Sequence, residues 1–199
     1  MDENKELIFQ RNSIEFVTVA AEYCAFLERS EGQTRFQIVD TSLKILPLLY
    51  LKALLLPPCE AIGFEEPEIY VSEEIYEQMR AHLARILADK DDYLEVFTPD
   101  IAYSEGPLTA SVAEGLCDIY QVLKDFIFVF QQGVHETMHD SLALCRERFV
   151  EYWGQTLVNI LRPLHEIAMS TNDTEETDMA ESDLDSSDLA IEEEGDKQW

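Results

Sequence analysis

Apolar residues recur every three or four positions along most of residues 1–170, which is the spacing of amphipathic α-helices. Several such stretches follow one another, and short segments that carry glycine or proline separate them. The pattern predicts an all-α domain over residues 1–170, built as an antiparallel bundle of five to six helices. Residues 171–199 do not continue this pattern and form a separate region.

The first helix is expected to begin at Asn12, because a glutamate, Glu15, follows three positions later. In this arrangement, a capping box, the two side chains exchange hydrogen bonds with the backbone of the first turn. Ser72, followed by Glu73 and Glu74, predicts the start of a third helix, since acidic side chains are favourable near a helix N-terminus.

The second helix carries the most apolar sequence of the chain. It is expected to begin at Thr34, with Gln37 as the partner in a capping box, and to stop at Pro57–Pro58. Its leucines fall on every face, and a helix that is apolar all round is normally buried all round. We therefore predict that it is the central helix, kinked at Pro47 because proline removes a backbone donor.

The second half of the domain is also predicted to be mainly helical. Residues 89–106 have a mixed pattern, which fits a short extended piece or a helical turn. A long helix is expected from Pro107 to about Val134, and the last helix from His135 to about Met169. Pro163 is expected to separate the final turn of that last helix.

The chain is strongly acidic. It has 14 Lys and Arg against 41 Asp and Glu, which gives a formal net charge of −27 at pH 7. Such a chain repels phosphate groups, so direct nucleic-acid binding and docking on anionic membranes are not expected. Residues 171–199 contain twelve acidic residues and one lysine, with no aromatic residue before Trp199. This composition predicts a disordered acidic tail.

The tail suggests the leading hypothesis for function. A few apolar residues are spaced among its acidic ones, namely Leu184, Leu189, Ile191 and Trp199. Acidic segments with such anchors can bind a basic, grooved partner protein, with charge steering the approach and the anchors holding the complex. We therefore expect a non-enzymatic protein–protein interaction module. A merely solubilising tail and an acidic nucleic-acid mimic are the alternatives from charge, and the oligomeric state is left open.

One motif suggests an enzyme instead. Residues His135, Glu136 and His139 spell H-E-x-x-H, in which two histidines on one helix face can bind zinc and the glutamate can act as general base. A zinc-dependent hydrolase is thus the alternative function. A third ligand would have to come from Glu151, His165 or Glu166, none of which stands in a recognisable ligand motif.

The context of the motif speaks against metal chemistry. Thr137 occupies a position where such enzymes usually pack an apolar side chain, and the surrounding chain predicts no substrate-binding sheet. Glu136-x-x-His139 also has the spacing used in di-iron bundles, but the sequence contains no second Glu-x-x-His pair. No cofactor is therefore expected.

Location is predicted from the cysteines and from the absence of targeting signals. The four cysteines, Cys24, Cys59, Cys117 and Cys145, contain no closely spaced pair, which favours structural thiols in a reducing compartment. The first residues are acidic where a secretory signal has basic ones. No apolar stretch reaches the ~20 residues that a transmembrane helix needs. A cytoplasmic location is expected.

Three stretches of the domain carry a family resemblance: Tyr120–Phe126, Phe149–Gln155 and Leu157–Asn159. With them the chain resembles an uncharacterised bacterial family, a domain of unknown function common in Bacteroidetes. The likeness covers about residues 1–170 and leaves out the tail. It implies a cytoplasmic helical domain, and it brings no activity, cofactor or catalytic residue to transfer.

Overall fold

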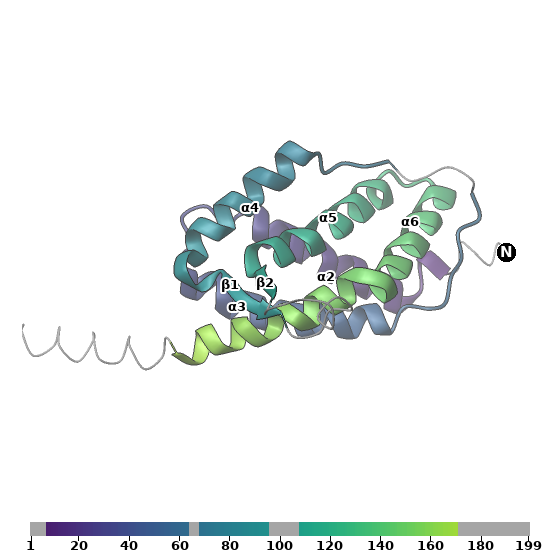
Figure 1. Ribbon diagram of the computed structural model, residues 1–199. Helices are drawn as coiled ribbons and strands as arrows, with labels where there is room; N and C mark the ends of the chain where they lie inside the picture. Colours follow the sequence, from purple (N-terminus) through teal and green to yellow (C-terminus); the bar gives the residue numbers. More distant parts are fainter. Residues whose placement is uncertain (1–6, 64–67, 96–107, 171–199) are drawn as a thin grey trace, which may run out of the picture.

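The computed structural model describes residues 7–63, 68–95 and 108–170, and these form a helical bundle (Figure 1). The helices are α2 (Arg11–Glu28), α3 (Arg35–Leu54), α4 (Glu73–Leu87), α5 (Val112–Gln131) and α6 (His135–Arg148). A π-helical turn, Phe149–Trp153, joins α6 to a further helical segment over 154–170. The predicted all-α bundle is confirmed. The acidic tail over residues 171–199 lies outside the described residues.

Helix α5 lies at the centre of the bundle. Twelve of its twenty residues are buried, and it contacts α2, α4 and α6. The Tyr23 hydroxyl of α2 donates to the Leu116 carbonyl of α5 at 2.8 Å. Gly115 lies against the 154–170 segment so closely that a Cβ at this position would be 2.5 Å from Cγ2 of Ile160. The tight approach of two helices therefore requires a glycine here.

The prediction that the second helix is buried all round is wrong. The capping box of α3 is confirmed, since Thr34 N donates to Gln37 Oε1 at 2.9 Å and Gln37 N donates to Thr34 Oγ1 at 3.3 Å. Pro47 also lies inside the helix. Only six of the twenty residues are buried, however, because α3 packs mainly against α2 and leaves its outer face uncovered.

The expected capping box at Asn12 is also wrong. The N-cap of helix α2 is Gln10, two residues before Asn12, and its side chain makes no cap hydrogen bond. The Glu15 carboxylate instead accepts from Arg11 Nε at 2.7 Å and from Lys52 Nζ of α3 at 2.6 Å. The Glu15 side chain, which the local pattern assigned to the helix cap, thus forms two ion pairs instead. The Asn12 amide donates to the Leu55 carbonyl at 3.0 Å and further joins α2 to α3.

A small hairpin replaces the expected start of the long helix. Strand β1 (Asp92–Glu95) pairs with β2 (Leu108–Ser111) in antiparallel register, with Asp92 opposite Ser111. Helix α5 therefore begins at Val112, where Ser111 accepts a hydrogen bond from Glu114 N at 3.0 Å. The 3-10 turn η1 (Ala88–Lys90) links α4 to this hairpin.

The two remaining helical predictions have different outcomes. Helix α4 begins after Ser72, whose side chain accepts from Ile75 N at 3.3 Å, and Glu73 and Glu74 occupy its first turn as expected. The expected break at Pro163 is wrong, since residues 154–170 are continuously helical through this position. The departure from regular α-helix occurs earlier, in the π-helical turn, where the buried Trp153 indole donates to the Cys145 carbonyl at 3.0 Å.

Candidate functional site

The two histidines of the H-E-x-x-H motif lie in different environments at the start of α6. His135 is an exposed first residue whose ring meets the Phe9 ring edge-on, with 5.7 Å between their centroids. His139 is 2% exposed, and its Nδ1 lies 3.3 Å from Oδ1 of Asp140. Glu136, the proposed general base, is exposed. One imidazole thus faces solvent and the other is packed inside.

The motif does not build a metal centre with its expected third ligands. Within residues 7–63, 68–95 and 108–170, no three His, Cys, Asp or Glu side chains are arranged to hold a metal ion. Glu151 lies in the π-helical turn, while His165 and Glu166 are exposed on the 154–170 segment. The geometry of the described residues therefore gives no support to zinc hydrolysis.

Asp140, the residue after His139, binds a different feature, the connection between α3 and α4. We call residues 57–63 and 68–72 the strap, since they run past the ends of α5 and α6 (Figure 1). The Asp140 carboxylate accepts hydrogen bonds from the backbone N–H groups of Ile62 at 2.7 Å and Gly63 at 2.8 Å. A Cβ on Gly63 would collide with Oδ2 of Asp140, so the close approach of backbone to carboxylate requires glycine.

A second aspartate holds the other half of the strap. Asp125 of α5 accepts from the backbone N–H groups of Tyr70 and Val71, both at 2.8 Å. Burial raises the pKa of Asp125, against the opposing effect of these two N–H groups and of Arg148. The strap is therefore fastened to the bundle through its main chain by two carboxylates, one from each of two neighbouring helices.

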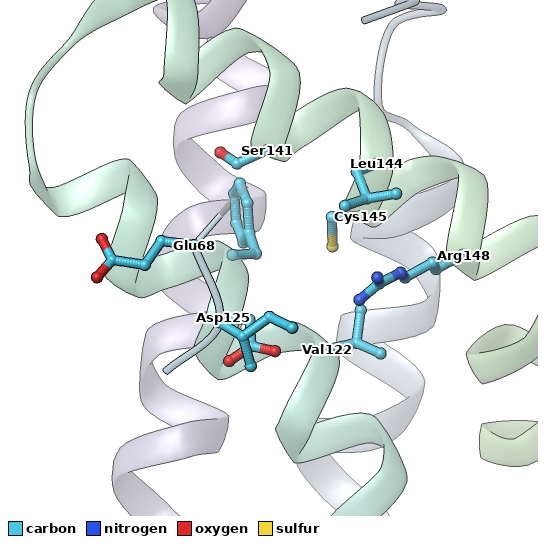
Figure 2. A pocket seen from close by; sticks show the side chains of 9 residues that line it. Glu68, Val122, Asp125, Ser141, Leu144, Cys145 and Arg148 are labelled. Atoms are coloured by element: carbon cyan, nitrogen blue, oxygen red, sulfur yellow. The ribbon is translucent and has the colours of Figure 1, made fainter. Parts of the chain in front are cut away.

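The strap and α6 enclose a hollow of about 650 Å³. A separate small cavity of about 20 Å³ lies between α5, α6 and the strap, which is room for a water molecule (Figure 2). The lining of the hollow carries two guanidinium groups, Arg146 and Arg148, against four carboxyl groups, those of Glu60, Asp140, Glu147 and Glu151. With charges of both signs in its lining, the hollow does not favour an anion. It does not favour a particular cation either, because the Asp140 carboxylate is already bound to the strap. We interpret the aspartates as structural clamps.

The most distinctive surface lies on α3 and just beyond its end. A row of apolar side chains is exposed there: Pro47, Leu48, Leu51, Leu54, Leu55 and Pro58, which we call the α3 stripe. Its four leucines are 43%, 51%, 58% and 45% exposed in chain order. Their three- and four-residue spacing places them on one face of the helix. Contiguous exposed apolar surface of this kind is typical of interaction sites.

The charge around the α3 stripe differs from that of the rest of the chain. Residues 41–59 contain no Asp or Glu, which makes this the longest acid-free run of a chain with 41 acidic residues. Two lysines lie in the same run: Lys44 pairs with Asp40 at 2.7 Å, and Lys52 pairs with Glu15 at 2.6 Å. The stripe is thus an apolar surface of low net charge on an acidic protein.

The sequence contained the signal for this surface, because its leucines fall on every face of the helix. The same pattern fits both a helix that its own chain buries and a helix that leaves one face for another molecule. None of the helices in the described part of the chain is both long and apolar enough to span a bilayer. The expected tail anchors Leu184, Leu189, Ile191 and Trp199 lie outside the described residues.

All four cysteines are free thiols. Cys24, Cys117 and Cys145 are buried in the helices, and Cys59 is half-buried in the strap. Burial raises the pKa of each thiol, and Arg146 partly opposes this effect at Cys59. The buried cysteines therefore act as small apolar side chains.

The comparisons with known proteins agree with the resemblance inferred from the sequence. The family described as Domain of unknown function (DUF5063) matches residues 7–170. Among solved structures, the crystal structure of protein BF1032 from Bacteroides fragilis is similar at 58% sequence identity, with a TM-score of 0.72. The similarity covers 81% of this chain and 94% of that one. A search among curated proteins finds no match.

Proposed function

The chain belongs to the DUF5063 family, a domain of unknown function, and we propose that it is a non-enzymatic module that binds another protein through the α3 stripe. The observation that carries this proposal is the continuous row of exposed leucines. A single exposed leucine is ordinary on a protein surface, but a row along one helix face is not.

The energy available at the α3 stripe suits a reversible protein contact. Fully burying one leucine side chain contributes about 1.5–3 kcal/mol. The four leucines of the stripe are each about half exposed, so a partner that covered them would gain roughly half of that amount from each. The cost of association offsets much of this gain, and the remainder is typical of a moderate affinity.

The charge of the chain indicates the kind of partner. With a net charge of −27, the protein attracts a partner that carries a basic surface, and long-range attraction accelerates their encounter. The acidic residues of 171–199 extend this attraction, with Leu184, Leu189, Ile191 and Trp199 as anchors. The proposal includes a cytoplasmic location, which the four free thiols support.

Affinity capture from native lysate with matched full-length variants tests the proposal. Leu51→Ser combined with Leu55→Ser makes the stripe polar. Leu94→Ser is the control, because Leu94 is 60% exposed on β1 and lies outside the stripe. We expect a partner that the wild type and the control both retain and that the double variant loses, with unchanged thermal unfolding in all three. Equal capture by all three would overturn the proposal.

A further inference from the structure

We infer that the α3 stripe is also the docking surface for the chain's own acidic segment, residues 179–191, which covers the stripe until a partner protein displaces it. This inference rests on the proposed function, because it names the regulation of the same surface. Three observations support it, namely the charge around the stripe, the place where the described chain ends, and the spacing of apolar residues in the segment.

The first observation is charge complementarity. Residues 171–199 carry twelve acidic side chains and one lysine, so most of this acidic protein repels them. The run 41–59 adds no carboxylate to this repulsion, and its two lysines pair with Asp40 and Glu15. Lys44 remains 73% exposed in its pair with Asp40, so a further carboxylate can approach its ammonium group. The apolar residues of an acidic segment thus meet an apolar surface of low net charge, on which one exposed lysine remains accessible.

The second observation is the place where the described chain ends. Ser170 is the last described residue of the helical segment 154–170 and lines the same hollow as Asp89 and Lys90 of η1. Asp89 is also 3.2 Å from the guanidinium of Arg35, the first residue of α3. The hollow that Ser170 lines therefore extends to the short turn that is ion-paired with the first turn of α3.

The distance along α3 can be covered by the chain that follows Ser170. Leu51 is sixteen residues after Arg35, which corresponds to about 24 Å at the helical rise of ~1.5 Å per residue. An extended chain covers about 3.3 Å per residue, so roughly eight residues span this length, and further residues are needed for the gap between Ser170 and Arg35. The segment that begins at Met179 is thus the first that can lie over the stripe.

The third observation is the apolar content of that segment. Met179, Leu184, Leu189 and Ile191 lie among acidic and small polar residues between positions 179 and 191. A tether of this length holds the segment near the stripe at an effective concentration on the order of 1 mM. A weak contact, with a Kd of about 100 µM, is then enough to cover the stripe in most molecules. A partner that binds the segment or the stripe more tightly would open it.

Binding of a labelled peptide of residues 171–199 provides the test, since the chain's own segment 179–191 competes with the peptide for the α3 stripe. Fluorescence anisotropy would measure its binding to the full-length wild type and to a full-length variant with Leu184→Ser, Leu189→Ser and Ile191→Ser. We expect the variant to bind the peptide with an apparent Kd about ten-fold lower than the wild type, because the internal competitor is weakened. A peptide with the same three substitutions should not bind, which separates apolar contact from charge.

Two further full-length variants show where on the protein the peptide binds. Adding Leu51→Ser and Leu55→Ser to the triple variant should abolish peptide binding, whereas adding Leu94→Ser should leave it unchanged. Equal peptide binding by the wild type and the triple variant, or peptide binding that survives loss of the stripe leucines, would overturn the inference. A concentration-dependent mass doubling of the wild type that the stripe substitutions abolish would also overturn it, because a second copy would then be the occupant.

The two proposals can fail separately. If the stripe substitutions remove a captured partner but not the peptide, the regulatory inference is wrong and the proposed function stands. If they abolish peptide binding but no partner protein is captured, the segment covers the stripe and the proposed function is wrong.

Discussion

Helices α3 and α5 have the same length and nearly the same number of apolar residues, but α3 lies at the surface of the protein and α5 at its centre. Each has twenty residues, of which twelve in α3 and thirteen in α5 are apolar. Six residues are buried in α3 and twelve in α5. The apolar content of a helix therefore says how much surface it can bury, but not whether its own chain provides the covering.

The difference follows from the neighbours of each helix. Three helices and the strap pack around α5, and Asp125 of α5 accepts hydrogen bonds from the backbone of the strap. Helix α3 is attached along one side, by the Lys52–Glu15 ion pair, the hydrogen bond from Asn12 to the Leu55 carbonyl, and the contact of the Tyr50 and Phe149 rings. Its other side carries the α3 stripe.

The largest effect is expected in α5. Leu116 is fully buried, so Leu116→Ala should lower the free energy of unfolding by about 2–5 kcal/mol through lost burial and the cavity left behind. Urea denaturation followed by circular dichroism measures the change. A cost below about 1 kcal/mol would mean that α5 is not the packed centre of the bundle.

A smaller loss is expected when the strap is released from α5. Asp125→Ala leaves the backbone N–H groups of Tyr70 and Val71 without their acceptor, which should cost about 1–3 kcal/mol. Hydrogen exchange should accelerate at residues 70 and 71 before it does in the centre of α5. Uniform acceleration along the chain would show instead that the substitution loosens the whole bundle.

The attachment of α3 to α2 should depend on pH. Hydrogen bonds from Lys52 and Arg11 lower the pKa of Glu15 to about 2, against an ordinary value of 4.5. Ionised Glu15 therefore stabilises the fold above pH 4.5, and this contribution is lost as the pH falls from 4.5 towards 2. Glu15→Gln should be slightly less stable than the wild type at pH 7 and equally stable near pH 2. Urea midpoints of both proteins at several pH values measure the difference, and a constant difference would contradict the assignment.

The smallest effect is expected on the α3 stripe itself. Leu51 is 51% exposed, so Leu51→Ala should change the free energy of unfolding by no more than about 0.5 kcal/mol. A leucine-to-alanine substitution should thus lower the free energy of unfolding several-fold more in α5 than in α3. A loss of 2 kcal/mol or more would contradict the exposed position of Leu51 in the bundle, because cover by the segment 179–191 at the affinity proposed above is worth only about 1.4 kcal/mol in total.

Local signals in the sequence predicted those features that neighbouring residues determine. The caps predicted from Thr34 with Gln37 and from Ser72 with two following glutamates are confirmed, because each cap forms within one turn. The helical interpretation of the long apolar stretch before Val134 is confirmed too, over Val112–Gln131. Glu15 was misassigned because Lys52, 37 positions away, binds it instead.

Features that depend on distant partners escaped the sequence pattern. The hairpin pairs Asp92 with Ser111, and nothing within either strand alone indicates the other. The clamps Asp125 and Asp140 look like ordinary polar positions on helices, although an acid inside the apolar run around Asp125 was a usable hint. The H-E-x-x-H spacing placed two histidines near one another on α6, but it did not determine which of them would face the interior.

The strap illustrates how a connection can be both fixed and adaptable. Asp125 and Asp140 grip main-chain N–H groups, which every residue except proline supplies. At residues 62, 70 and 71 the two aspartates therefore bind the backbone and not the side chain, and only Gly63 is required for its lack of a Cβ. Outward residues such as Ile69, which is 68% exposed, can therefore be exchanged over evolutionary time while the loop keeps its path.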